Sequence, residues 1–212
     1  MPREVEHGAP TLLVLDGSFG EGCVALCGLD GDTETQYQSA SAMTPHQPLV
    51  SRAATLLPDA AARDRLVAVL VGIGPGSYTG LRAATSLAAG LAAALRIPII
   101  QVPSDHALVL ARDASGQSGP VILPLGTREV LLVDDAGSHA AVSRVVLRND
   151  APTGVDLARL APHLPEALVS AGSDAITALR AMGGRSALDV QASEILVRYP
   201  APPRGAERGG AQ

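Results

Sequence analysis

The pattern of hydrophobic and polar positions is clearest between residues 66 and 102, where it predicts a strand, a helix and a second strand. Residues 66–71 form an uninterrupted apolar run that ends at a glycine, which is typical of a buried parallel strand. Pro98 stops the following helix, and residues 99–102 return to a strand pattern. The apolar side chains between them recur at steps of three and four, as on one helix face, at Leu81, Ala84, Ala88, Leu91 and Leu95.

A glycine-rich turn joins this strand to this helix. Glycine enters positive φ without penalty, and N–H groups at the start of a helix can bind an anion. A P-loop would need a Lys-Ser/Thr pair after Gly80, where this chain has Leu81 and Arg82. A dinucleotide fingerprint has a shorter spacing between its first and last glycine than the stretch from Gly74 to Gly80. It also has no proline at the position that Pro75 occupies here. We therefore favour close packing of strand and helix over direct nucleotide binding.

Similar patterns predict the remaining elements. We expect strands at 11–15, 23–29, 33–39, 121–125, 129–133, 143–147 and 167–171. We expect helices at 48–57, with Pro48 in the first position, and at 105–113, 155–161 and 173–182. Cys23 and Cys27 would lie about 13 Å apart along one strand, too far for a disulfide, so buried free thiols are predicted.

Composition narrows the class of protein. The 212 residues are 47% hydrophobic and 17% charged, enough for a sizeable core in a folded chain. Aromatic residues make up 2%, and the net charge is −5, which argues against a surface that binds nucleic acid by itself. No export signal or membrane-spanning stretch is recognised, so we expect a cytoplasmic protein.

Catalytic and metal-binding patterns are not recognised in the sequence. None of the five histidines pairs with another at a spacing of four, and no Gly-x-Ser-x-Gly elbow occurs. No base is evident beside Ser77, so peptidase chemistry and a metal site are not expected.

The nine residues of the turn have a more specific resemblance. They read Gly74, Pro75, Gly76, Ser77, Tyr78, Thr79, Gly80, Leu81 and Arg82. This string resembles the signature of the TsaB (YeaZ) family, the bacterial partner subunits of the machinery that makes threonylcarbamoyladenosine in tRNA. Residues 194–198 are similar to the closing segment of that family. One departure is the stretch 123–125, which stands where the family has an acidic residue.

The resemblance implies a two-lobed α/β fold of the actin-like ATPase (ribonuclease H-like) type, with mixed sheets flanked by helices. We expect a flexible leader at 1–10, an N-terminal lobe at 11–102, a C-terminal lobe at 103–199 and a disordered tail at 200–212. In such folds the first hairpin cradles phosphate, which would give Asp16 and Ser18 a phosphate or metal-water role. The favoured alternative makes both residues turn formers, because Asp and Ser side chains bond local backbone groups. Gly17 replaces the middle residue expected there.

The function implied is that of a non-catalytic subunit which binds and activates a TsaD-like catalytic subunit, with a TsaE-like ATPase as a further partner. tRNA would be contacted only indirectly, no cofactor is firmly expected, and ATP would bind only within the complex. The residues expected at the partner interface, or at a homodimer through the same helices, are His46, Leu49, Ala53, Ala88, Leu91 and Ala92, with Arg82 as a charged contact. Ala88→Trp or Ala92→Trp would then block binding and leave the chain folded. The alternative use of these helices is an entirely intramolecular pair.

Two other functions stay open at this point. One is a stand-alone ATPase or small-molecule kinase of the same fold, which tight ATP binding by the isolated chain would favour. The other is a nucleotide-dependent oxidoreductase built on the glycine turn, although the spacing from Gly74 to Gly80 argues against it.

Overall fold

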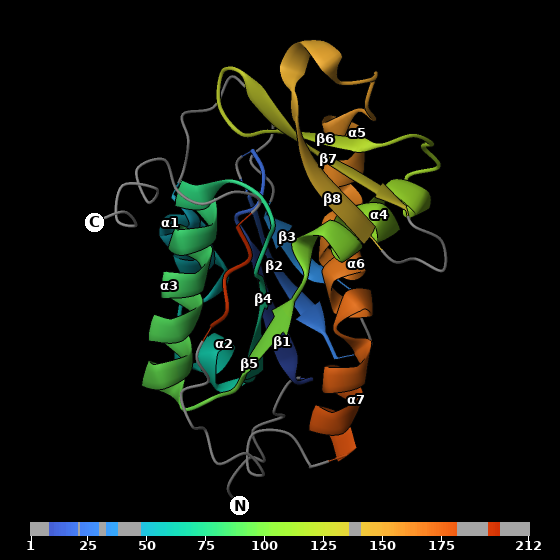
Figure 1. The fold of residues 1–212 in the computed structure, drawn as a ribbon. Coiled ribbons are helices and arrows are strands. Elements are labelled where there is room, and N and C mark those ends of the chain that lie inside the picture. The colour runs from blue at the N-terminus through green and yellow to red at the C-terminus, as the bar shows by residue number, and fades with distance from the viewer. Residues whose placement is uncertain are drawn as a thin grey trace, which may run out of the picture.

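The structure is a computed structural model that describes residues 9–20, 22–29, 33–37, 48–135, 141–181 and 195–199. Its larger sheet has five strands in the order β3-β2-β1-β4-β5 (Figure 1). β1 pairs antiparallel with β2 and parallel with β4, and β4 pairs parallel with β5. The bounds are β1 Thr11–Asp16, β2 Cys23–Gly28, β3 Thr33–Tyr37, β4 Leu66–Gly72 and β5 Ile99–Val102. All five predicted strands of this half are confirmed.

One face of the large sheet is covered by three helices from the same half of the chain. These are α1 (Leu49–Leu56), α2 (Ala60–Asp64) and α3 (Tyr78–Leu95), of which α2 was not predicted. Ala84 and Ala88 of α3 are fully buried and pack in one cluster with Leu13 and Leu15 of β1. Alanine at these positions lets the helix lie close to the sheet, and the predicted helix and its inner face are confirmed.

The opposite face of the large sheet carries the helices that follow β5. These are α4 (Ser104–Ala114), α6 (Leu164–Ala171) and α7 (Ser173–Ala181). Their core continues into a second, antiparallel sheet of three strands in the order β6-β7-β8 (Figure 1). The strands are β6 Val121–Pro124, β7 Glu129–Asp135 and β8 Ala141–Leu147, and the short turns after them are η1 Arg148–Asp150, α5 Leu157–Leu160 and η2 Ala161–His163.

One predicted strand is wrong, because residues 167–171 belong to helix α6. An apolar run of this length has no periodicity that separates a strand from a buried helix. The helix starts just upstream of this run, with Pro165 in its first turn, and Leu164 and Leu168, four residues apart, are both buried. Pro165 pre-sets the backbone angle of a helix start and removes a donor that would have no partner there.

Cys23 and Cys27 are both buried and form no disulfide, as predicted. Burial is the main cause that raises the pKa of Cys23, so this thiol is held in its protonated form. No helix in the described part of the chain is long and apolar enough to cross a membrane. The boundary between lobes at residue 102 stays a prediction, and residues 1–8 and 200–212, expected to be leader and tail, lie outside the described residues.

The packing of α3 corrects the expectation that a tryptophan at position 88 leaves the chain folded. Ala88 is 0% exposed, whereas its neighbour Ala89 is exposed. Ala88→Trp would overfill the core, so we expect the free energy of unfolding to fall by about 3 kcal/mol or more. Ala89→Trp is the matched control and should unfold like the wild type in urea titrations. Equal stability of the two variants would contradict this packing.

Candidate functional site

The glycine-rich turn before α3 packs directly on the turn between β1 and β2. The Ser77 N–H donates to the Ser18 carbonyl oxygen at 2.6 Å. A Cβ atom on Gly17 would overlap the carbonyl oxygen of Gly80, and a Cβ atom on Gly80 would overlap that of Gly17. Glycine is therefore required at both positions, because the two backbones are too close for any side chain.

The same turn is tied to the start of α4. The Gly74 N–H donates to Ser104 Oγ at 2.9 Å, and the Ser104 N–H donates to the Gly74 carbonyl oxygen at 2.9 Å. Gly74 has a φ of +93°, in the region that favours glycine, and the Gly74–Pro75 peptide bond is cis. Ser77 caps α3 by accepting from the Gly80 N–H at 3.3 Å.

These contacts occupy three backbone N–H groups that a nucleotide phosphate at this turn could have used. An anion site needs backbone N–H groups that face the ligand. Here the N–H groups of Gly74, Ser77 and Gly80 already donate to oxygen atoms of the chain itself. The glycines provide the close packing that the sequence favoured, and no step of phosphate chemistry follows from their geometry.

Asp16 and Ser18 form a local turn beside the glycines. The Asp16 side chain is fully buried, and its Oδ1 accepts from the Ser18 N–H at 2.5 Å, the bond of a turn-forming Asp. The Asp16 carboxyl group packs against the backbone of Gly72, where an added Cβ atom would overlap Asp16 Oδ2. Burial raises the pKa of Asp16, and the hydrogen bond from the Ser18 backbone opposes the rise. The contacts are those of a turn former.

The residues expected at the partner interface lie mostly inside the chain. Leu49, Ala53, Ala88 and Ala92 are between 0% and 9% exposed, and Leu91 is half-buried. The reason is that the apolar period identifies the helix face that packs on the sheet. The outer face of α3 consists of other exposed residues, namely Arg82, Ala83, Ser86, Ala89, Gly90, Ala93 and Ala94. His46 lies outside the described residues.

A segment from the far end of the chain, residues 195–199, lies against the glycine turn. The Arg198 N–H donates to the Ile73 carbonyl oxygen at 2.7 Å. Its guanidinium makes two bonds to the Asp105 carboxylate, at 2.9 and 3.2 Å. Asp105, 2% exposed in the first turn of α4, also accepts from Ser143 Oγ of β8 at 2.5 Å. Arg198 therefore connects the end of β4, α4 and β8.

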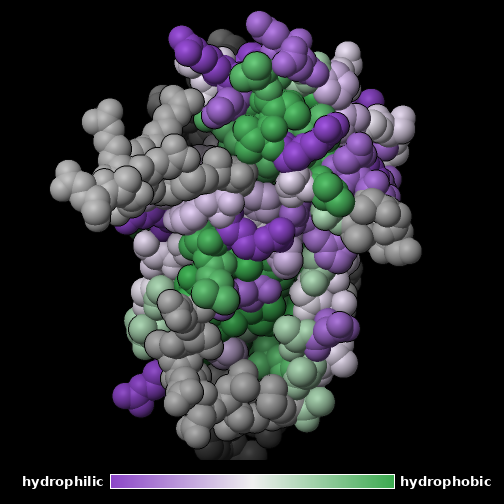
Figure 2. All heavy atoms as spheres, viewed as in Figure 1, coloured by the Kyte–Doolittle hydropathy of each residue, from purple (hydrophilic) through white to green (hydrophobic). Residues whose placement is uncertain are grey.

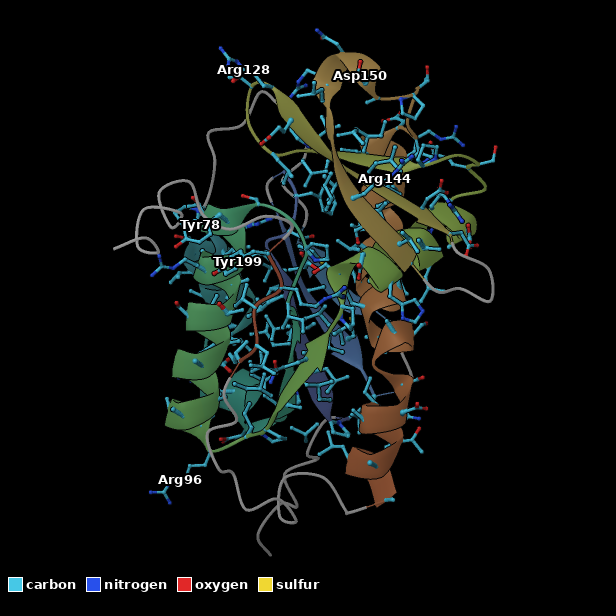
Figure 3. The ribbon with its side chains drawn as sticks, in the orientation of Figure 1. Tyr78, Arg96, Arg128, Arg144, Asp150 and Tyr199 are labelled. Carbon is cyan, nitrogen blue, oxygen red and sulfur yellow. The ribbon has the colours of Figure 1, made fainter. Side chains whose placement is uncertain are left out.

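This segment ends in an aromatic contact with the turn motif. The rings of Tyr78 and Tyr199 have their centroids 5.0 Å apart, and both lie near the N-terminal end of α3 (Figure 3). Arg82 donates to the Tyr78 hydroxyl at 2.8 Å, and its guanidinium carbon lies 5.3 Å from the ring centroid. Sequence reasoning identified Tyr78 and Arg82 but missed Tyr199, which no local pattern links to them. In the described ranges no group of three metal-ligating side chains occurs.

Comparison with known proteins gives the family. Residues 48–183 match the model of the family described as TsaD, tRNA N6-adenosine threonylcarbamoyltransferase. The chain belongs to the TsaD family. No curated protein sequence matches it.

Two solved structures share the fold of this TsaD-family chain. One is an uncharacterized protein with similarity to peptidase YEAZ from Pseudomonas aeruginosa, with a TM-score of 0.59 and 23% identity over 91% of this chain and 100% of that one. The other is YeaZ from Pseudomonas aeruginosa, with a TM-score of 0.59 and 24% identity over 90% and 99%. The resemblance to TsaB (YeaZ) and the predicted actin-like α/β fold are confirmed.

The contact between the two turns can be tested with glycine substitutions in one helix. Gly80→Ala places a methyl group on the Gly17 carbonyl oxygen, so we expect the free energy of unfolding to fall by about 1–3 kcal/mol. Gly90, also in α3, has no atom within 4 Å of an added Cβ. Gly90→Ala should therefore raise the free energy of unfolding by about 0.5–1 kcal/mol. Denaturant unfolding of both variants measures the difference, and a tolerated Gly80→Ala would contradict the contact.

The buried carboxyl predicts a pH dependence of stability. Because burial raises the folded-state pKa of Asp16 above its ordinary value of 3.8, the native chain keeps this proton where the unfolded chain has lost it. The stability contributed by Asp16 therefore falls as pH rises from 3.8 through the folded pKa. In the Asp16→Asn variant this position carries no titrating group. The free energy of unfolding of the variant, relative to that of wild type, should therefore rise between pH 3.8 and the folded-state pKa of Asp16 and stay constant at higher pH. Urea unfolding at a series of pH values tests this, and a constant difference would contradict it.

Proposed function

We propose that this chain is a non-catalytic partner subunit of a tRNA threonylcarbamoyladenosine modification complex, in which it binds and activates a TsaD-like transferase subunit. Membership of the TsaD family supports the link to this modification. The fold likeness to YeaZ over most of the chain supports the comparison with that group of proteins rather than with an unrelated ATPase.

The observation that carries the proposal is the outer face of α3. Its inner face is buried on the sheet, while Ala83, Ala89, Ala93 and their neighbours are exposed. Only one of the helix's 18 residues, Arg82, is charged. A surface helix of a protein without partners usually presents charged side chains to water. An outer face of small, uncharged side chains lets a second helix approach closely.

The neighbouring helix α1 extends this surface. α1 lies beside α3 on the same face of the large sheet (Figure 1). Val50 of α1 is 59% exposed, although Leu49 and Ala53 next to it face the core. Exposed apolar side chains next to a helix face with a single charged residue favour a protein partner over solvent.

The chemistry of the chain supports the remaining parts of the proposed complex. Three backbone N–H groups of the glycine turn donate to the chain itself, which supports assigning nucleotide hydrolysis to another subunit, such as a TsaE-like ATPase. The net charge of −5 supports indirect contact with tRNA, held by the other subunits. A role in tRNA modification fits a cytoplasmic location.

Sedimentation velocity of the chain, alone and mixed with the TsaD-like subunit of the same organism, tests the proposal. We expect a heavier boundary in the mixture. Ala89→Trp and Ala93→Trp place a large ring on the outer face of α3 and should lower the affinity at least tenfold. Ala178→Trp is the matched control, because Ala178 is an exposed alanine on α7.

Three outcomes would contradict the proposal in different ways. No heavier boundary with a folded chain would remove the partner role, and ATP titration would then test the stand-alone ATPase. A boundary that neither tryptophan affects would move the interface to another surface. Equal loss with Ala178→Trp would show that the effect is not specific to α3.

A further inference from the structure

Two exposed aromatic residues lie side by side in the described part of the chain. The whole sequence has three tyrosines, one phenylalanine and no tryptophan. Tyr78 and Tyr199 are 42% and 36% exposed, and their rings are in contact although 121 positions separate them in the chain. Tyrosine and arginine are enriched among the residues that dominate binding in protein interfaces.

Arg82 gives this cluster a positive charge that the described residues do not neutralise. Its polar contact is with the Tyr78 hydroxyl, and no carboxylate of the described part of the chain lies within ion-pair distance of it. α3 has no acidic residue in its first turn, and Arg82 is exposed. A ligand that complements this site therefore carries a negative charge.

Arg198 holds Tyr199 in position. Both its backbone and its guanidinium are bonded, to Ile73 and to the buried Asp105, and the Leu196 N–H donates to Gln101 Oε1 at 2.9 Å. Leu196 is 66% exposed, and Figure 2 shows hydrophobic residues gathered where this segment passes beside α3. An aromatic side chain fixed in this way loses little further freedom when a ligand binds to it.

We propose that Tyr78, Arg82 and Tyr199 anchor a carboxylate-bearing segment of a partner protein, and that Arg198 is the positioning residue that presents Tyr199 to it. The carboxylate pairs with Arg82, and an apolar side chain of the partner packs on the exposed ring of Tyr199. This inference rests on the proposed function and adds a charged anchor at one end of the α3 surface.

A protein is favoured over a nucleic acid as the occupant. Backbone binding to nucleic acid uses several cations, whereas Arg82 is the single uncompensated cation of the cluster, because Arg198 is paired with Asp105. The chain as a whole is acidic, with a net charge of −5. One arginine beside two aromatic rings matches one carboxylate in an apolar setting.

Titration calorimetry with the TsaD-like subunit, using the full chain, tests the anchor. Arg82→Glu should weaken binding at least tenfold and reduce its dependence on salt, because the charge pair is lost. Tyr199→Ala should weaken binding about tenfold through loss of the ring. The controls are Arg180→Glu, an exposed arginine on α7, and Leu147→Ala, an exposed apolar residue on β8, and both should bind like wild type.

A double-mutant cycle tests the role of Arg198. If Arg198 acts by presenting Tyr199, Arg198→Ala should weaken binding as Tyr199→Ala does, and the double variant should lose no more than either single variant. Additive losses would overturn the positioning role. Circular dichroism of each variant is the control that checks whether the chain is folded.

The outcomes separate this inference from the proposed function. If the wild type binds and Arg82→Glu and Tyr199→Ala bind equally well, the anchor is wrong and the partner role stands. If the wild type does not bind, the proposed function fails and the anchor fails with it. Binding of tRNA that Arg82→Glu abolishes, without any effect on the protein partner, would overturn the protein occupant in favour of a nucleic acid.

Discussion

The backbone contact between Gly17 and Gly80 is the constraint on which the rest of the structure depends. It joins the turn after β1 to the first turn of α3, with each glycine facing the carbonyl oxygen of the other. Because no side chain separates the two backbones, the Ser77 N–H reaches the Ser18 oxygen and α3 starts directly over the sheet. Ala84 and Ala88, one and two turns further on, can then be fully buried with nothing larger than a methyl group. The same start directs the opposite side of α3 outward.

This use of glycine also limits the backbone N–H groups that the turn can offer to a phosphate. A phosphate site and a close backbone contact both need glycines at a helix start, because a side chain would be in the way. A phosphate and a second backbone segment, however, compete for the same N–H donors. In this chain the groups of Gly74, Ser77 and Gly80 bond to Ser104, Ser18 and Ser77. Asp16, with its pKa raised by burial, is held as part of the interior. The sheet of this actin-like fold thus has α1 and α3 packed on one of its faces.

The sequence predicted the parts of this structure that depend on long local patterns. The unit from β4 to β5 has a full-length apolar strand and a helix of 18 residues, and Pro98 separates this helix from β5. The period of the apolar side chains is therefore unambiguous in each element. α6 has only eight residues, and the pattern of residues 167–171 predicts a strand there, because a short apolar run has no clear period. The bond from Arg198 to Asp105 joins residues 93 positions apart, and no local rule predicts it. The apolar period marks the side of a helix that the chain itself covers, which is why Ala88 and Ala92, expected at a partner interface, are buried on the sheet.

Small side chains on the outer face of α3 affect the stability of the free chain in one way and the formation of a complex in another. In the free chain each exposed alanine leaves little apolar area in water, so the face costs little stability. On association, alanine and glycine have almost no rotamer freedom to lose, and the helix axis can approach its neighbour closely. Such a face has weak specificity, because many small, flat surfaces would fit it. Specificity therefore needs a directional contact at its edge, and Arg82 with the two tyrosines is the group of described residues at the end of α3 that can supply one.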